Sequence, residues 1–139
     1  MWFSDRVASV KSYILIIDDD EDVRRLLSRQ LQSLQHATKV ATDGEEGLKF
    51  ASSELFDLIF VDHQMPGLAG HEVIRTLREA GVESKIVVIT ASLDDRIFDQ
   101  YMDPELTVDG FLNKPFDLGQ VERCLDTVLI RGGRFLSPF

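Results

Sequence analysis

Short apolar runs alternate along the chain with longer segments in which apolar residues recur every three or four positions. The first pattern predicts buried strands, and the second predicts amphipathic helices. Five such pairs in strict alternation imply an α/β fold, with a parallel sheet covered on both faces by right-handed crossover connections. The predicted strands lie at 13–17, 38–41, 58–61, 85–89 and 110–113, and the predicted helices at 23–34, 43–51, 70–81, 94–102 and 118–130.

These elements divide the chain into one domain and two flanking segments. A chain of 139 residues has the length of a single domain with a proper core. The predicted domain covers 13–130, after an N-terminal extension over 1–12 and before a C-terminal tail over 131–139 that is too short for an output domain. Helical spacing within the extension predicts a short amphipathic helix over 2–11 that packs on the domain or on a second copy. Its apolar residues are Trp2, Phe3, Val7 and Val10.

Charge and composition exclude several classes of function. The formal net charge of −9 argues against direct binding of nucleic acid, which needs clustered Lys and Arg to neutralise phosphates. No apolar stretch approaches the ~20 residues of a membrane span, and the first residues do not form a signal peptide, so a cytoplasmic location is expected. The lone Cys124 excludes an internal disulfide and is expected to be a small buried hydrophobic residue.

Polar residues follow four of the predicted strands, at the point where each strand ends. Asp18 and Asp19 follow the first strand, Asp62 the third, Thr90 the fourth and Lys114 the fifth. Because the carboxyl ends of parallel strands meet at one edge of a sheet, we expect these side chains to lie together. Carboxylates clustered at a buried strand end need a compensating cation, and Mg²⁺ suits them. The set lacks a hydrolase triad and instead suits transfer of a phosphoryl group to a carboxylate, with Mg²⁺ and Lys114 neutralising its oxygens.

Four motifs in register resemble those of the receiver domain of two-component response regulators, of the chemotaxis-regulator type. They are ILIIDDD at 14–20, DLIFVDHQMPG at 57–67, IVVITA at 86–91 and GFLNKPF at 110–116. Each motif alone is a weak signal, but their shared order and spacing make a chance match very improbable. The resemblance implies a flavodoxin-like, doubly wound, five-stranded parallel sheet of order 2-1-3-4-5.

The resemblance also assigns the phosphoacceptor and the metal ligands. Asp62 resembles the phosphoacceptor, which takes a phosphoryl group from a phosphohistidine of a histidine kinase or phosphotransfer protein. Asp19 resembles the principal Mg²⁺ ligand, and Asp18 is expected to act mainly through ordered water. Asp62 itself and the main-chain carbonyl of Gln64 complete the protein's share of the coordination.

Three further residues resemble the parts that respond to the phosphoryl group. Lys114 pairs with Asp62 at rest and with a phosphoryl oxygen afterwards, Thr90 then hydrogen-bonds the phosphoryl group, and Phe111 turns inward behind it. The surface formed by 94–102, 110–113 and 118–130 reads out this change. The family is a signalling switch that catalyses its own phosphorylation and dephosphorylation rather than an enzyme. Its output passes to a downstream protein target or to an effector domain that this sequence lacks.

The acidic residues that follow Asp19 have a simpler interpretation. Asp20, Glu21 and Asp22 are expected to be favourable charges at a helix N-terminus. Asp18, Asp20 and Asp22 share the spacing of an EF-hand loop, but Val23 stands where that loop needs glycine and its bidentate glutamate is also missing. This motif therefore does not indicate a calcium site.

Two other functions fit part of this pattern. A phosphatase of the haloacid dehalogenase type also places an aspartate nucleophile after its first strand, but this does not explain the loop that follows Asp62. An unphosphorylated docking module with the receiver fold would be favoured by loss of the acceptor, the metal acids or the lysine, and none is lost. The three histidines, His36, His63 and His71, lack metal-ligand spacing and are expected to be solvated.

One segment departs from the family pattern. Residues 101–109 replace the usual alanine-rich helix end, and Pro104 disfavours helix in the residue before it. We therefore expect the helix over 94–102 to be short or bent. This argues against generic dimerisation through that surface, while a homodimer as such is left open.

Overall fold

A computed structural model of the chain describes residues 12–136. The helix expected over 2–11 lies outside the described residues. The strands are β1 (Tyr13–Ile17), β2 (Ala37–Ala41), β3 (Leu58–Asp62), β4 (Lys85–Thr90), β5 (Gly110–Asn113) and β6 (Phe135–Leu136). The helices are α2 (Glu21–Ser33), α3 (Gly44–Ser53), α4 (Gly70–Glu79), α5 (Asp95–Gln100) and α6 (Leu118–Leu125), and α6 continues as a π-helical turn over Asp126–Ile130.

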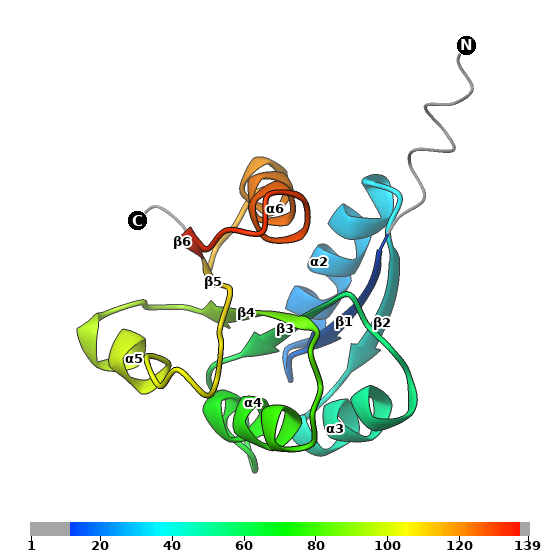
Figure 1. The fold of residues 1–139 in the computed structure, drawn as a ribbon. Coiled ribbons are helices and arrows are strands. Elements are labelled where there is room, and N and C mark those ends of the chain that lie inside the picture. Colours follow the sequence, from blue (N-terminus) through cyan, green and yellow to red (C-terminus); the bar gives the residue numbers. More distant parts are fainter. Residues whose placement is uncertain (1–11, 137–139) are drawn as a thin grey trace.

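The sheet is entirely parallel and has the order β2-β1-β3-β4-β5-β6. Its first five strands confirm the predicted order 2-1-3-4-5. Helices lie on both faces, with α2 and α6 on one side and α3, α4 and α5 on the other (Figure 1). This is the doubly wound arrangement in which ligands bind at the carboxyl ends of the strands.

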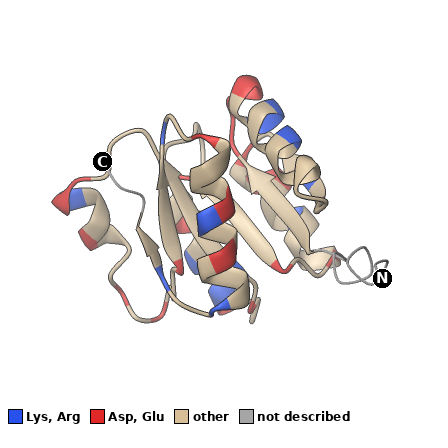
Figure 2. Ribbon diagram, turned by 90° about the horizontal axis from the view of Figure 1, so that it is seen from above, with Lys and Arg blue, Asp and Glu red and all other residues tan. Residues whose placement is uncertain are grey.

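Alternation along the strands builds two separate cores. In β3, Ile59 and Val61 pack with α3 and α4, whereas Leu58 and Phe60 pack with α2 and α6. Successive side chains of a strand point to opposite faces, so near-continuous apolar strands are needed when helices cover both faces. Charged residues lie mainly on the helices and near the strand ends (Figure 2). Cys124 is fully buried in the second core, as expected.

The sixth strand was not predicted. The amide of Phe135 donates to the carbonyl of Asp109 at 3.0 Å, and its ring is buried in the second core. Gly110 permits this pairing, because a Cβ there would lie 2.7 Å from the carbonyl oxygen of Phe135. The C-terminal segment therefore covers the edge of β5 beside α6 (Figure 1).

Helix α5 is short, as predicted. It has six residues and ends before Tyr101, three positions ahead of Pro104. The segment that follows is held by Arg78 of α4, whose guanidinium donates to the carbonyls of Leu106 and Thr107, each at 2.8 Å. The unusual segment is thus fixed to the neighbouring helix. Within residues 12–136, no helix is long and apolar enough to cross a membrane.

Two adjacent substitutions test the contribution of β6. Phe135→Ala removes a ring that is 8% exposed, and we expect the free energy of unfolding to fall by about 3 kcal/mol. Leu136→Ala is the matched control, because that side chain is 56% exposed, and its loss should stay below about 0.5 kcal/mol. Urea denaturation measures both values. Equal losses for the two variants would contradict the packing of β6 on the sheet.

Candidate functional site

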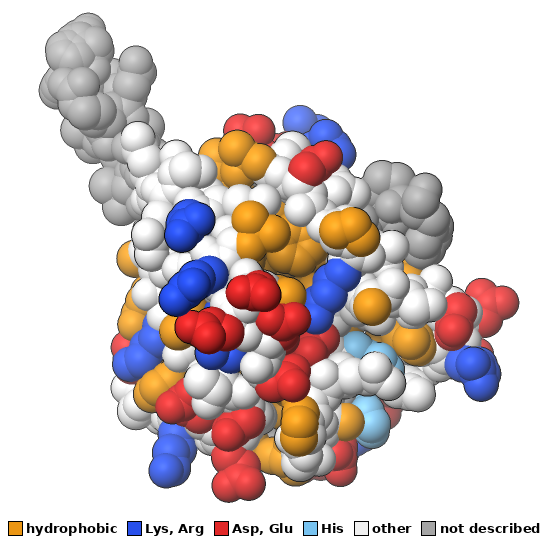
Figure 3. Space-filling model, turned by 180° about the vertical axis from the view of Figure 1, so that it is seen from behind, with side chains coloured by type: hydrophobic (Ala, Val, Ile, Leu, Met, Phe, Trp, Pro, Cys, Tyr) orange, Lys and Arg blue, Asp and Glu red, His pale blue; other side chains and the backbone are white. Residues whose placement is uncertain are grey.

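The polar residues predicted at the strand ends do lie together. β1, β3, β4 and β5 are consecutive neighbours in the sheet, and they bring Asp18, Asp62, Thr90 and Lys114 to the same edge. A cavity of about 360 Å³ opens there, lined among others by Asp19, Asp62, Thr90 and Lys114. Acidic side chains gather on this face of the molecule, and histidine side chains lie beside them (Figure 3).

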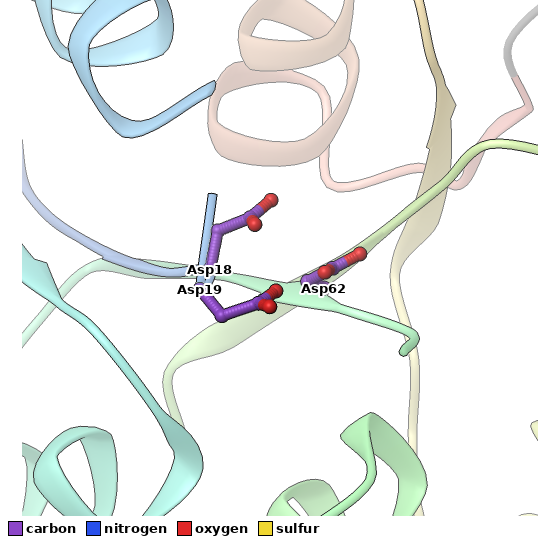
Figure 4. Close-up of side chains that lie close together, drawn as sticks. All are labelled: Asp18, Asp19 and Asp62. Carbon is purple, nitrogen blue, oxygen red and sulfur yellow. The ribbon is translucent and has the colours of Figure 1, made fainter. Parts of the chain in front are cut away.

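Three carboxylates converge in this acid pocket. Asp18, Asp19 and Asp62 each offer an oxygen within 4.8 Å of the others, and among the described residues they form the one such group of three metal-binding side chains. Their carboxylates extend into the same space (Figure 4). Asp18 is fully buried and Asp62 is 5% exposed, whereas Asp19 is exposed. Desolvated carboxylates this close repel one another by about 3 kcal/mol at an effective dielectric near 20.

One cation on the chain offsets part of this negative charge. The ammonium of Lys114 lies 3.2 Å from Oδ2 of Asp18 and 3.4 Å from Oδ1 of Asp62. It therefore bridges both carboxylates rather than pairing with Asp62 alone. Although burial lowers the pKa of Lys114, the two carboxylates raise it above its ordinary value, so the ammonium stays charged. The peptide bond between Lys114 and Pro115 is cis.

The pocket remains under-neutralised despite Lys114. Burial, reinforced by the negative charge of Asp18, raises the pKa of Asp62 to about 7, although Lys114 acts to lower it. Oδ1 of Asp18 accepts the amide of Asp20 at 2.9 Å, whereas buried Oδ2 has the Lys114 ammonium at 3.2 Å as its ion-pair partner and no further hydrogen bond from the described residues. A buried carboxylate oxygen that shares one ammonium with a second buried carboxylate, beside a third carboxylate, fits a hard divalent cation.

Asp20 has a structural role, as expected. Its side chain caps α2 by accepting the amides of Asp22 and Val23, so its carboxylate serves the helix start, although the residue also lines the rim of the cavity. Arg24 was not singled out from the sequence. Its guanidinium donates to the carbonyl of Asp18 at 2.8 Å and so ties the first turn of α2 to the end of β1.

The two predicted switch residues are both buried. Thr90 is 3% exposed, and its hydroxyl donates to the carbonyl of Ser92 at 3.3 Å and accepts the Ser92 amide at 3.2 Å. Phe111 is also 3% exposed and packs between two aromatic rings, with centroid distances of 5.3 Å to Phe98 and 5.7 Å to Tyr101. The ring of Phe111 is therefore turned inward in this structure.

The expectation that all three histidines are solvated is wrong for His63. This residue is 9% exposed, and a hydrogen bond of 2.6 Å joins its Nδ1 to the hydroxyl of Tyr101. Burial lowers the pKa of His63 below its ordinary value. Nδ1 of His71, beside the same tyrosine, is also buried. Tyr101 carried no signal in the sequence, because its partner lies 38 positions away and Tyr101 itself belongs to none of the four motifs.

Comparisons with known proteins agree with this geometry. The response regulator receiver domain family matches residues 14–126. The alkaline phosphatase synthesis transcriptional regulatory protein PhoP of Bacillus subtilis is 36% identical over 118 residues, which cover 85% of this chain and 48% of that protein. CiaR of Streptococcus pneumoniae is 35% identical, over 88% of this chain and 53% of that protein. The chain thus spans about half the length of these curated relatives.

Solved structures show the same fold. The chemotaxis protein CheY4 of Vibrio cholerae superposes with a TM-score of 0.81 at 26% identity, covering 86% of this chain and all of that one. The response regulator TrrA of Thermotoga maritima, solved in complex with Mg²⁺-BeF, gives a TM-score of 0.71 at 30% identity, covering 84% of this chain and 98% of that one. An acidic pocket facing a lysine is typical of a phosphoacceptor site in such domains. The chain therefore belongs to the response regulator receiver domain family, whose members act as signalling switches.

Proposed function

We propose that Asp62 accepts a phosphoryl group from a phosphohistidine of a histidine kinase or phosphotransfer protein, in a reaction that requires Mg²⁺. The observation that carries this proposal is the position of Asp62, buried against Asp18 and Asp19 and in contact with Lys114. Receiver domains partner with histidine kinases, and the relatives PhoP and CiaR are transcriptional regulatory proteins. We infer that the output passes to a downstream protein target or to an effector domain.

The transfer itself needs few groups. A carboxylate oxygen of Asp62 attacks phosphorus, the bond from phosphorus to the imidazole nitrogen breaks, and the imidazole leaves with the electron pair. When bound, Mg²⁺ supplies positive charge that neutralises the phosphoryl oxygens during the transfer. Asp18, Asp19, Asp62 and the main-chain carbonyl of Gln64 would hold the ion, and the Lys114 ammonium would bind a phosphoryl oxygen.

The phosphorylated state would change the hydrogen bonds behind the pocket. The hydroxyl of Thr90, now bonded within its own loop to Ser92, would donate to the phosphoryl group instead. Phe111 stands behind Thr90 on the neighbouring strand and is already turned inward in this structure, so the phosphorylated state would hold it there and fix the surface formed by α5, β5 and α6. Attack of water on phosphorus would later release phosphate and restore the carboxylate, so the chain would catalyse both directions of its own switching.

Intact-mass spectrometry after incubation with acetyl phosphate tests the phosphoacceptor. With Mg²⁺ the wild type should gain the mass of one phosphoryl group, and without Mg²⁺ it should gain none. Asp62→Asn should abolish the gain, because an amide oxygen is a poor nucleophile. Asp43→Asn is the matched control, since asparagine also caps helices and Asp43, which caps α3, is not among the residues that line the acid pocket.

Two results would contradict the assignment of Asp62. A mass gain that persists in Asp62→Asn would place the acceptor elsewhere. A wild type that stays unmodified with Mg²⁺ and several phosphoryl donors would favour the docking module over the phosphoacceptor.

The raised pKa of Asp62 predicts how stability depends on pH without metal. Because the folded-state pKa of about 7 exceeds the unfolded value of about 3.9, the group favours folding at low pH, and this contribution is lost as the pH rises through about 7. In Asp62→Asn this part of the decline should disappear. Mg²⁺, which binds the ionised carboxylate, should raise the melting temperature of the wild type more at about pH 8 than at about pH 5.

Thermal unfolding at these two pH values, with Mg²⁺ or with a chelator, measures the effect. The quantity to compare is the difference between the wild type and Asp62→Asn, since other groups titrate in both proteins. An identical pH dependence in the two proteins would show that Asp62 is already ionised in the metal-free fold at low pH.

A further inference from the structure

Tyr101 connects the phosphoacceptor strand to the short helix α5. It follows α5 directly and is 1% exposed, and it has the largest of the fully buried side chains among the described residues. Its hydroxyl is joined at 2.6 Å to Nδ1 of His63, the residue next to Asp62. The ring of Tyr101 packs edge-on against that imidazole, with the centroids 5.6 Å apart. The end of α5 thus contacts the residue adjoining the acceptor.

The backbone around this hydrogen bond has little room to move. The amide of His63 donates to the carbonyl of Ile89 at 2.8 Å, and the carbonyl of His63 accepts the amide of Gly70 at 3.1 Å. A Cβ on Gly70 would lie 2.5 Å from the carbonyl oxygen of Asp62 and 3.1 Å from the hydroxyl of Tyr101. The end of β3, the start of α4 and the tyrosine hydroxyl are therefore packed without space for a methyl group. A shift of the backbone beside Asp62 must move Tyr101 or break its hydrogen bond.

On its other side, Tyr101 contacts the surface that we expect to respond. Its ring packs edge-on against Phe111 of β5 at 5.7 Å, and Phe111 in turn packs against Phe98 of α5 at 5.3 Å. These contacts form a continuous path of packed side chains from His63 to both α5 and β5, in which Phe98 is partly buried and the others are buried. Such packed contacts can carry energetic coupling when an element at one end has two arrangements.

We propose that Tyr101 is a positioning residue that holds the backbone beside Asp62 through His63 and couples the state of the acid pocket to α5. This rests on the proposed binding of Mg²⁺ and a phosphoryl group in that pocket. Coupling of this kind is reciprocal. If binding at the pocket changes the state of α5, then a substitution that loosens the end of α5 must change the affinity of the pocket. Tyr101 is not expected to touch the phosphoryl group.

Tyr101→Phe tests the proposal, because it removes the hydroxyl and keeps the ring. The chain offers a matched control in its other tyrosine, Tyr13, whose hydroxyl donates to Oε1 of Glu54 at 2.7 Å near the opposite edge of the sheet. The probe is Mg²⁺ with beryllium fluoride, which takes the place of the phosphoryl group. Two quantities are measured in each protein: the dissociation constant of the probe by calorimetry, and the change in hydrogen exchange of the α5 amides on binding.

We expect the probe to slow or speed exchange in α5 of the wild type. In Tyr101→Phe most of that change should be lost, and the probe should bind roughly tenfold more weakly, as when groups behind a metal site are removed. Tyr13→Phe should keep the affinity and the response of α5, even though it also loses a hydroxyl hydrogen bond. If the role of Tyr101 were purely structural, both variants would have a lower melting temperature, but the dissociation constant of the probe and the change in hydrogen exchange of α5 would stay as in the wild type.

Further variants keep the proposal falsifiable. His63→Leu removes the same hydrogen bond from the other side and replaces Tyr101→Phe if that variant does not fold. If the coupling passes through the hydrogen bond between Tyr101 and His63, the two substitutions together should weaken binding of the probe no more than the more harmful of them does alone. Wild-type affinity and a wild-type response of α5 in both single variants would overturn the proposal. Failure of the wild type itself to bind the probe would instead refute the proposed function, and the role of Tyr101 would fall with it.

Discussion

The buried pair of carboxylates on Asp18 and Asp62, which share the single ammonium of Lys114, is the constraint on which the site depends. One positive charge cannot neutralise two desolvated negative charges and the exposed Asp19 as well. The raised pKa of Asp62 is a direct consequence, because protonation is the remaining way for the metal-free protein to relieve the repulsion. A divalent cation relieves it without a proton and leaves the carboxylate free to act as a nucleophile. Metal binding and phosphoacceptor chemistry thus follow from the same imbalance.

The strand alternation explains how one strand end can serve two purposes. Asp62 is the last residue of β3 and His63 follows it directly, and successive side chains of an extended chain point to opposite faces of the sheet. The first therefore lies in the acid pocket, while the second is directed toward the core that contains Tyr101 and Phe111. A change of charge at Asp62 therefore occurs only one residue away from His63, whose side chain packs on the other side of the backbone.

Much of the fold and of the acid pocket could be predicted from the sequence, because both depend on local pattern. An apolar run that stops at Asp18, Asp62 or Lys114 predicts both a strand and the polar residue at its end. The parallel topology of the sheet then brings these strand ends together. β6 could not be predicted in this way, since a two-residue strand has no period and is held by its contact with Gly110. The burial of His63 was missed for a related reason. It depends on a contact between distant residues, and no local spacing reports such a contact.

The segment that departs from the family pattern gives Tyr101 its place. Helix α5 ends at Gln100, directly before this residue, and in the chain that follows the carbonyls of Leu106 and Thr107 accept hydrogen bonds from Arg78 of α4. The C-terminal end of α5 is therefore anchored both through the tyrosine and through the chain that follows it. Its N-terminal end, capped by Asp94, lines the acid pocket instead. A helix of six residues held in this manner cannot slide along the sheet without breaking one of these contacts.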